Sequence, residues 1–417
     1  MEVDLTTGNS IGSSGELSVE IFGRDTGEPL PGATVSIYNA TDGSLIRTFT
    51  ADEAGQIPLL RLQSPPLEYS LEPGAAQPYS QYNITVQAAG YEPLEIIDAE
   101  VFPDQLALQP ILLNPLAGET PVEEEIVVPG NTLFVPSTPK VPEAEIKPVT
   151  ETGEIVLSRV VIPEYVVVHD GVPSNRDAKN YYVTYRDYIK NVASSEIYAT
   201  WPDAAIRANV LAIMSFTLNR VYTEWYRGKG YDFTITSSTA YDQKWSYGRT
   251  VFESISQIVD EMYTNYLSRP NVRQPILTQY CDGKNVTCPN WMSQWGSKNL
   301  ADQGLRTIEI LRYYYGNDMF INTAEEISGI PSSYPGELGI GSSGSKVRQL
   351  QEQLNAISRN YPAIPRVNAD GVYGPLTAES VEEFQSIFGL PITGAIDYRT
   401  WYKISQIYVG VTGIAEL

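Results

Sequence analysis

Histidine and cysteine are scarce in this 417-residue sequence, which has one histidine, His169, and two cysteines, Cys281 and Cys288. A zinc amidase needs about three protein ligands, usually including two histidines. One histidine and two cysteines offer few ligands for such a site. A Cys–His endopeptidase or a serine triad would rest on His169 alone. Carboxylate chemistry has no such shortage, since the sequence holds 50 acidic residues. We therefore expect no metal and no cofactor.

Long apolar runs are also missing. No uninterrupted run approaches the ~20 residues that span a bilayer, and residues 1–20 have neither the basic n-region nor the apolar h-region of a signal peptide. We expect no membrane span and no ordinary export signal.

Basic residues are nearly absent from the first third. Before Lys140 there are 20 acidic residues and three basic ones, Arg24, Arg47 and Arg61, whereas the rest of the chain has 30 acidic and 25 basic residues. The front third is therefore an acidic unit of its own, which argues against nucleic acid as a partner. The length fits two to four domains.

The residue patterns predict a multidomain α+β protein. Short alternating apolar and polar runs with tight-turn residues predict an N-terminal all-β sandwich over 1–114. Recurrent prolines and clustered charges over 115–158 predict an extended, exposed linker, which either only spaces the domains or carries an activating cleavage. A central mixed α/β domain is expected over 159–328, with helices near 185–197, 203–226, 251–267 and 300–315 and a capping box at Thr184 and Asp187.

The front stretch TGEPLPGATVSIYN, with TADEAGQIPL and YNITVQAAGYEP after it, resembles the carboxypeptidase-regulatory or pilin-repeat type of β-sandwich. Many pilin repeats carry a Lys–Asn isopeptide bond, which the absence of lysine before Lys140 excludes within this region. The domain is either a passive β-domain or a restraint on the domain behind it.

Residues 336–410 contain three amphipathic stretches separated by glycine-bearing turns, which predicts a three-helix unit. The residues that carry a family likeness are Gly344, Val347, Leu350, Gln351, Asp370, Gly371, Tyr373, Gly374, Thr377, Phe384, Gln385, Gly394, Thr400 and Trp401. They resemble the peptidoglycan-binding domain of many wall hydrolases. The resemblance implies peptidoglycan as a partner, because aromatic faces pack on sugars and amides bond hydroxyl groups.

The central stretch SSEIYATWPDAAIRANVLA places Glu196 shortly before a Trp-Pro pair and an alanine-rich helix, and SQWGSKNLADQG follows from Ser293. Both stretches resemble the SpoIID-type sporulation lytic transglycosylase domain. Two departures stand out: CPNWM replaces the usual glycine- and histidine-rich lead-in, and Met214 stands where an arginine is common.

The order of the parts resembles the SleC-type spore cortex-lytic enzymes of clostridia. That resemblance implies a zymogen at the spore cortex or cortex–coat boundary, activated at germination by a subtilisin-like protease. Spore cortex peptidoglycan would be its substrate.

The resemblance makes Glu196 the expected catalytic residue. A lytic transglycosylase can work with one glutamic acid as acid and then base, without the paired carboxylates of ordinary glycosidases. Its pKa should be raised by burial near Val192, Ile197, Tyr198 and Trp201. Glu224, Glu253 and Glu261 are rivals whose helical contexts favour surface roles.

The expected substrate-binding residues lie in two polar stretches: Ser237, Thr239, Tyr241, Asp242 and Gln243 in the first, and Ser293, Gln294 and Trp295 in the second. Cys281 and Cys288 flank a turn-like hexapeptide, and a local disulfide is the first interpretation, ahead of free thiols and a metal site. His169 is expected to be structural. Two further hypotheses stay open: a catalytically silent wall-binding or spore-coat scaffold, and an amidase.

Overall fold

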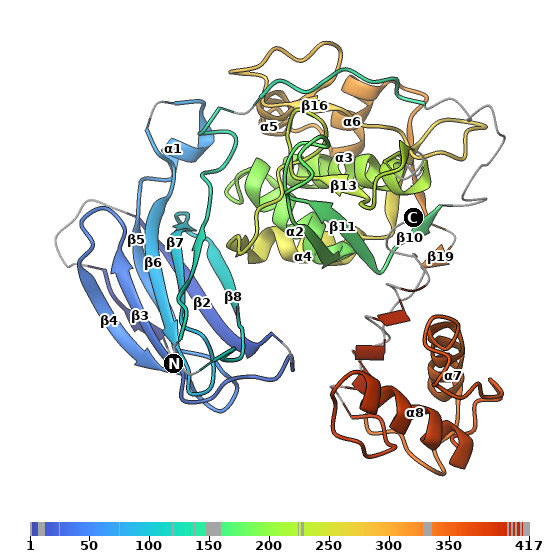
Figure 1. Cartoon of the computed structure of the whole chain (residues 1–417). Helices are drawn as coiled ribbons and strands as arrows, with labels where there is room; N and C mark the ends of the chain where they lie inside the picture. Colours follow the sequence, from blue (N-terminus) through green and yellow to red (C-terminus); the bar gives the residue numbers. More distant parts are fainter. Residues whose placement is uncertain are drawn as a thin grey trace.

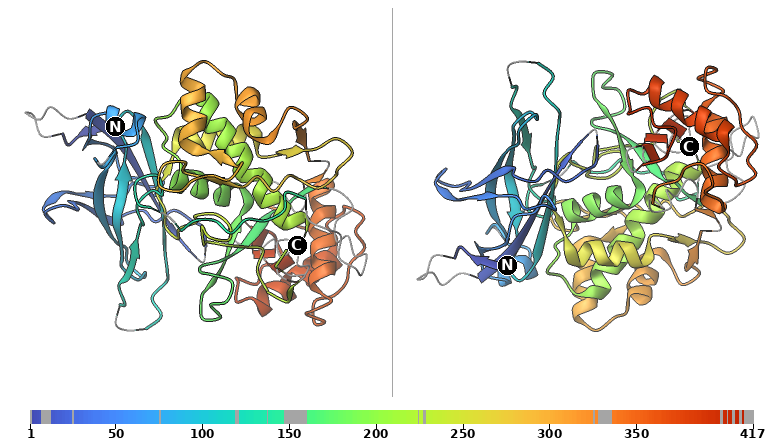
Figure 2. Two further views of the ribbon diagram at one scale, coloured as in Figure 1. Left: turned by 90° about the horizontal axis from the view of Figure 1, so that it is seen from above. Right: turned by 90° about the horizontal axis from the view of Figure 1, so that it is seen from below.

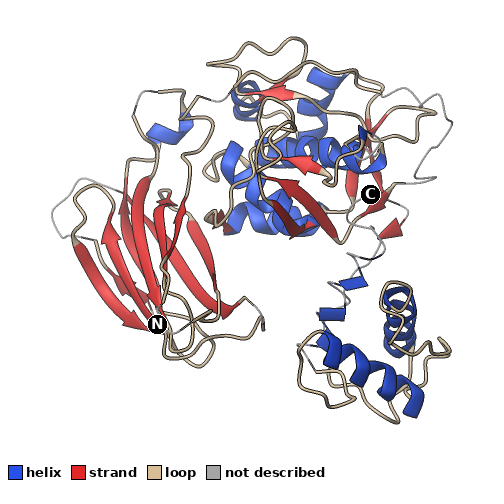
Figure 3. Cartoon of the chain, in the orientation of Figure 1, coloured by secondary structure: helices blue, strands red, loops and turns tan. Residues whose placement is uncertain are grey.

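The computed structural model describes residues 2–6, 13–24, 26–74, 76–118, 121–136, 138–146, 160–223, 225–226, 229–324, 326–327 and 336–397, and then 400–401, 403–404, 407–408 and 411. Strands dominate the front of the chain, helices dominate its centre, and a small helical unit follows (Figures 1 and 3). The chain is therefore a mixed α+β protein of several parts. Among the described residues, no helix is both long and apolar enough to cross a bilayer.

The front of the chain is an all-β sandwich of two five-stranded sheets. One sheet has the order β1 (Glu2–Asp4), β5 (Leu59–Ser64), β2 (Ser13–Gly23), β8 (Leu106–Leu113) and β14 (Val251–Phe252). The other has the order β4 (Leu45–Thr50), β3 (Thr34–Asn39), β6 (Ser80–Gln87), β7 (Leu94–Val101) and β9 (Glu124–Val127), and the short helix α1 (Glu68–Leu71) lies between β5 and β6 in the chain. Every second residue of β2 is buried, as the alternating sequence predicts.

The sandwich and the helical centre share one hydrophobic core. Strand β14 comes from the centre of the chain and pairs antiparallel with β8 at the edge of the front sheet. Phe102, the residue after β7, packs its ring against Phe252 at 5.1 Å and against Tyr198 at 5.2 Å between ring centroids. Figure 2 shows the two parts side by side in both views. The front and central domains are thus joined by a shared sheet and a shared hydrophobic core.

The central domain is organised around two buried helices. Helix α2 (Tyr185–Glu196) begins at Thr184, whose side chain accepts a hydrogen bond from the Asp187 amide at 3.3 Å, as the predicted cap requires. Helix α3 (Asp203–Tyr222) is buried on nearly every face. Around them lie α4 (Glu253–Met262), α5 (Gln294–Asp302) and α6 (Thr307–Tyr315).

Small sheets surround these helices. One contains β12 (Asn180–Thr184), β11 (Tyr165–His169) and β13 (Ile235–Thr236). Pairs are formed by β10 (Val161–Ile162) with β19 (Glu326–Ile327), by β15 (Asn265–Ser268) with β18 (Phe320–Thr323), and by β16 (Tyr280–Cys281) with β17 (Met292–Ser293).

Three predicted helices differ from the observed ones. Helix α3 ends at Tyr222 rather than near 226, and the helix expected over 251–267 stops at Met262, because residues 265–268 pair with β18 instead. The helix expected over 300–315 is interrupted: α5 ends at Asp302, and α6 starts at Thr307 after Gly304, whose φ of +85° lies in the left-handed region.

Residues 115–158, predicted to be an extended linker, are more ordered than a spacer where they are described. Residues 124–127 form strand β9, and Leu133 and Lys140 are buried. The expected cleavage interval overlaps 147–159, which lies outside the described residues.

The C-terminal unit has a hydrophobic core of its own, to which Leu350, Phe384 and Trp401 contribute. Helices α7 (Ser345–Ile357) and α8 (Pro375–Ile387) are described in full. The third helix expected there falls within 397–411, of which the structure describes only part.

Candidate active site

Glu196 is the last residue of α2, and only 3% of it is exposed. Its Oε1 accepts a hydrogen bond from the Lys244 amide at 2.7 Å, and its Oε2 accepts one from the Tyr280 hydroxyl at 2.5 Å. The Gln294 side-chain amide donates to the Glu196 backbone carbonyl at 3.2 Å. The Lys244 amide and the Tyr280 hydroxyl therefore hold the carboxyl group in one orientation, and Gln294 holds the backbone of the same residue.

Burial raises the pKa of Glu196 above its ordinary value. The nearby Lys140 charge, the Lys244 amide and the Tyr280 hydroxyl act in the opposite direction, because each favours the carboxylate. A carboxyl group with a raised pKa can carry a proton near neutral pH, which is what a general acid needs.

A cavity of about 30 Å³ lies beside Glu196. Its lining comes from the central domain and from the segment before it: Thr132, Thr138, Pro139, Lys140, Glu196, Thr239, Tyr280, Cys281, Asp282, Val286 and Gln294. Of the eight expected substrate-binding residues, Thr239 and Gln294 line this cavity.

Asp242 and Gln243 hold the site together and do not line the cavity. Asp242 is fully buried, and its oxygens accept hydrogen bonds from Arg220 Nε at 2.6 Å and from the Tyr226 hydroxyl at 2.6 Å. Gln243 donates to the Tyr280 hydroxyl at 3.1 Å and accepts from Thr217 at 2.8 Å. Both are thus positioning residues in this arrangement.

The other expected substrate-binding residues are placed differently. Ser237 donates to Asp170 at 2.8 Å, and 37% of Tyr241 is exposed. Ser293 caps α5 by accepting from the Gly296 amide at 2.9 Å. Trp295 is buried, with its ring 5.0 Å from that of Trp201.

The sequence reasoning missed Tyr280, which donates to Glu196, and it also missed Lys140. Lys140 is 9% exposed, its ammonium donates to the Asp242 carbonyl, and it lies 5.0 Å from the Phe216 ring centroid and 5.2 Å from that of Tyr280. Burial lowers its pKa, whereas the charge of Glu196 raises it. A first lysine after 139 lysine-free residues was the available signal.

The segment after Lys140 continues across the central domain. The Val141 amide donates to the Ala240 carbonyl at 2.7 Å, and the Leu277 amide donates to the Glu145 carbonyl at 3.1 Å. Gln279 contacts the segment through both ends of its amide, at the Val141 carbonyl (2.8 Å) and the Glu143 amide (2.9 Å). Residues 138–146 are called the covering segment below: Thr138, Pro139 and Lys140 line the cavity beside Glu196, and residues 141–146 continue across the central domain.

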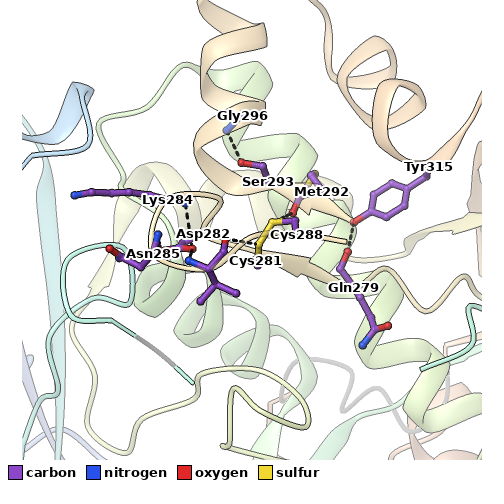
Figure 4. Close-up of a disulfide and its surroundings, with 11 residues drawn as sticks. Gln279, Cys281, Asp282, Lys284, Asn285, Cys288, Met292, Ser293, Gly296 and Tyr315 are labelled. Atoms are coloured by element: carbon purple, nitrogen blue, oxygen red, sulfur yellow. Dashed lines mark hydrogen bonds between the residues drawn. A yellow bond between two sulfur atoms is a disulfide. The ribbon is translucent and has the colours of Figure 1, made fainter. Parts of the chain in front are cut away.

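Cys281 and Cys288 are joined by a disulfide with a Cα–Cα distance of 5.6 Å (Figure 4). Inside the loop, Asp282 accepts hydrogen bonds from the backbone amides of Lys284 (3.3 Å), Asn285 (2.9 Å) and Val286 (2.8 Å). The disulfide and these bonds shape one wall of the cavity.

His169 and the rival glutamates lie in other surroundings. His169 Nδ1 is 2.8 Å from Asn180 Oδ1, and its ring stacks on Phe233 at 4.4 Å. Glu253 accepts from Gln257 at 2.8 Å, and Glu261 pairs with Arg207 at 2.6 Å on the surface. Glu224 lies outside the described residues. Within the described part of the chain, no cluster of three His, Cys, Asp or Glu residues could hold a metal ion.

The C-terminal unit matches a family model described as a putative peptidoglycan binding domain, over residues 343–404. The chain carries a peptidoglycan-binding domain. This confirms the coarse part of the sequence-based interpretation.

Two curated relatives match parts of the chain. The zinc D-Ala-D-Ala carboxypeptidase of Streptomyces albus G is 38% identical over 76 residues, 18% of this chain and 28% of that protein. S-layer protein B of Acidianus ambivalens is 35% identical over 80 residues, 19% of this chain and 14% of that protein. The chain thus spans less than a third of either relative.

Solved structures match parts of the chain as well. The SleB N-terminal domain is 28% identical with a TM-score of 0.16, over 18% of this chain and 96% of that one. The Bacillus anthracis TIE protein is 19% identical with a TM-score of 0.19, over 25% of this chain and 18% of that one. Likenesses with TM-scores this low assign neither a fold nor an activity to the chain.

Proposed function

We propose that this protein is the precursor of a lytic transglycosylase that cleaves the glycan strands of spore cortex peptidoglycan. The observation that carries the proposal is Glu196, a buried carboxyl group oriented by Tyr280 and the Lys244 amide beside a cavity. The peptidoglycan-binding domain supplies the substrate class. The resemblance of the sequence around Glu196 to the SpoIID-type motif supports the proposed lytic transglycosylase reaction. The SleC-type order of domains supports a location in the spore.

The mechanism needs a single acid that becomes a base. Protonated Glu196 donates its proton to the glycosidic oxygen as the bond to the muramyl anomeric carbon breaks. The resulting carboxylate then takes the proton of the muramyl 6-hydroxyl, whose oxygen closes on the anomeric carbon. The products are a free sugar hydroxyl and a 1,6-anhydromuramyl end, and no water is consumed.

Asp282 is the other carboxylate among the residues that line the cavity. Its two oxygens accept hydrogen bonds from the backbone amides of the disulfide loop, so they stabilise that loop. This arrangement favours one working acid over the paired carboxylates of a hydrolase.

The covering segment supports the zymogen part of the proposal. Lys140 lines the cavity beside Glu196, and its charge favours the ionised carboxylate, which cannot act as the acid. A cut within residues 147–159 would break the covalent connection between this segment and the catalytic domain, so that the segment could then leave. A subtilisin-like germination protease is the activator that the resemblance implies.

The test uses the full chain with a specific protease site introduced within residues 151–158, folded first and then cut. We expect it to release 1,6-anhydromuramyl fragments from purified cortex, as measured by mass spectrometry. Glu196→Gln should abolish these products, whereas Glu261→Gln, a surface glutamate paired with Arg207, should retain them.

Other products would identify the alternatives. Freed stem peptides without anhydromuramyl ends would favour an amidase. Binding to cortex with no soluble product would favour a catalytically silent scaffold. Undiminished anhydromuramyl products from Glu196→Gln would overturn the assigned role of Glu196.

A further inference from the structure

Two arginines of the central domain receive the two carboxylates of the covering segment. Arg220 Nη1 and Nη2 lie 3.0 Å and 2.5 Å from the Glu143 oxygens. Arg269 Nε and Nη2 lie 2.7 Å and 2.9 Å from the Glu145 oxygens. Both contacts are bidentate, the geometry in which a guanidinium binds a carboxylate most selectively.

Each arginine also has an acid from its own domain. Arg220 Nε donates to Asp242 at 2.6 Å, and Arg269 Nη1 donates to Asp318 at 2.5 Å. These acids would hold both guanidinium groups in place after the covering segment leaves. The guanidinium nitrogens that bind Glu143 and Glu145 would then have lost those carboxylates. With the covering segment in place the Arg220 side chain is fully buried and that of Arg269 is 18% exposed. Departure of Glu143 and Glu145 would therefore favour a new anionic partner at both arginines.

The covering segment also indicates the path that such a partner would follow. It runs from Lys140, beside Glu196, between the Ala240 and Leu277 backbones, with four hydrogen bonds that involve its own main chain. Glu143 and Glu145 are three and five residues beyond Lys140. In an extended chain they lie ~10 Å and ~17 Å further along. The covering segment therefore marks a path along the central domain on which a peptide can present carboxylates to Arg220 and then to Arg269.

We propose that Arg220 and Arg269 form a receptor for the carboxylates of the peptide stem that hangs from the muramyl sugar cleaved at Glu196. Glu143 and Glu145 occupy this receptor in the precursor and stand in for those carboxylates. The inference rests on the proposed function, and it assigns the enzyme a preference for glycan whose peptide stems are present and ionised.

The test measures binding, which needs no bond cleavage. The protein is the full chain with Glu143→Gln and Glu145→Gln, which weaken the covering segment, cut within 151–158 after folding. The probes are a soluble muramyl tripeptide with free carboxylates and the same compound with its carboxylates converted to amides. Calorimetry should show the acid binding at least tenfold more tightly than the amide.

Arg269→Gln should remove this preference by weakening the binding of the acid alone. The matched control is Arg207→Gln, because Arg207 lies on the same helix as Arg220 and also pairs with two carboxylates, those of Asp203 and Glu261, away from the covering segment. It should leave the preference unchanged.

Equal binding of acid and amide, or no binding of either, would overturn the receptor, as would a preference that survives in Arg269→Gln. The comparison of acid with amide on the unsubstituted arginines does not depend on how any arginine variant folds. Failure of the proposed function would instead appear as acid-selective binding by a chain that cleaves no glycan.

Discussion

The Tyr280 hydroxyl donates a 2.5 Å hydrogen bond to Glu196 Oε2, and both side chains are buried. Gln243 donates in turn to the same hydroxyl at 3.1 Å, which leaves the phenol proton directed at the carboxylate. Because the bond stabilises the ionised form, it lowers the pKa of Glu196 against the effect of burial. Tyr280 therefore adjusts the pH range over which Glu196 can act as an acid.

Tyr280→Phe should shift the activity of the cut enzyme to higher pH. Loss of the bond raises the pKa of Glu196, so the carboxyl group stays protonated further into the alkaline range. A hydrogen bond to a charged group contributes about 1.5 kcal/mol, which corresponds to about one pH unit. The alkaline limb of kcat/KM on cortex glycan measures this shift. Tyr315→Phe is the control, since that buried hydroxyl donates to the Gln279 carbonyl instead; equal limbs for both variants would contradict the assignment.

Lys140→Met should raise the pKa of Glu196 in the uncut chain. The Lys140 charge is the largest of the effects that favour the carboxylate. Without that charge, less counteracts the rise in the pKa of Glu196 that burial causes. The pKa of Glu196 is expected to rise because a cation close to a buried acid is lost. Titration of the ¹³C-labelled glutamate carboxyl signals measures it. Lys298→Met removes an equally buried lysine that pairs with Asp302, and should leave that signal unchanged.

Much of the fold could be predicted from the sequence because its determinants are local. Alternation along residues such as Leu17, Val19 and Ile21 specifies a sandwich strand, and Thr184 specifies where α2 begins. Strand β14 could not be predicted. It is two residues long, and its position depends on pairing with β8, more than 140 residues earlier in the chain.

The candidate site could be predicted only in part for a related reason. A motif identifies Glu196, but it does not show which polar neighbours line the cavity and which are buried in hydrogen bonds that position other residues. Asp242 and Gln243 appear equivalent to Thr239 in the sequence, yet both are buried in hydrogen bonds with α3. Prolines and charges made residues 138–146 resemble a solvated spacer, because burial of Lys140 depends on partners more than 70 residues later.

Arg249→Met should destabilise the front and central domains together. Arg249 and Glu100 form a fully buried ion pair between them, and the Asn131 amide also donates to Glu100 at 3.1 Å. Removing one partner of a buried pair leaves an uncompensated charge and costs about 3–5 kcal/mol. Chemical denaturation of the uncut chain measures the loss. The exposed Arg207–Glu261 pair supplies the control, since Arg207→Met should cost less than about 1 kcal/mol.

The Arg249 experiment also tests whether the two domains unfold as one unit. Their shared core predicts that fluorescence and circular dichroism report the same lowered midpoint in Arg249→Met. A separate early transition confined to the β-sandwich would show that the interface contributes little to either domain.

Glu164→Gln should stabilise the protein at alkaline pH. Glu164 is 6% exposed, neither of its carboxyl oxygens has a hydrogen-bond partner, and burial raises its pKa to about 8. In the unfolded chain the same group ionises near pH ~4.3. The native state therefore holds a proton that the unfolded state releases, and stability falls as the pH rises from the lower value towards the higher one.

Glu164→Gln removes this fall in stability with pH. Its advantage over the natural residue should therefore grow from pH 5 to pH 8 and reach a few kcal/mol, on the order of the linkage for a shift of this size. Denaturation midpoints at pH 5, 6.5 and 8 measure it, with the surface substitution Glu261→Gln as the control. A difference between Glu164→Gln and the natural chain that stays constant over this range would mean that the Glu164 carboxylate is not held protonated by its surroundings.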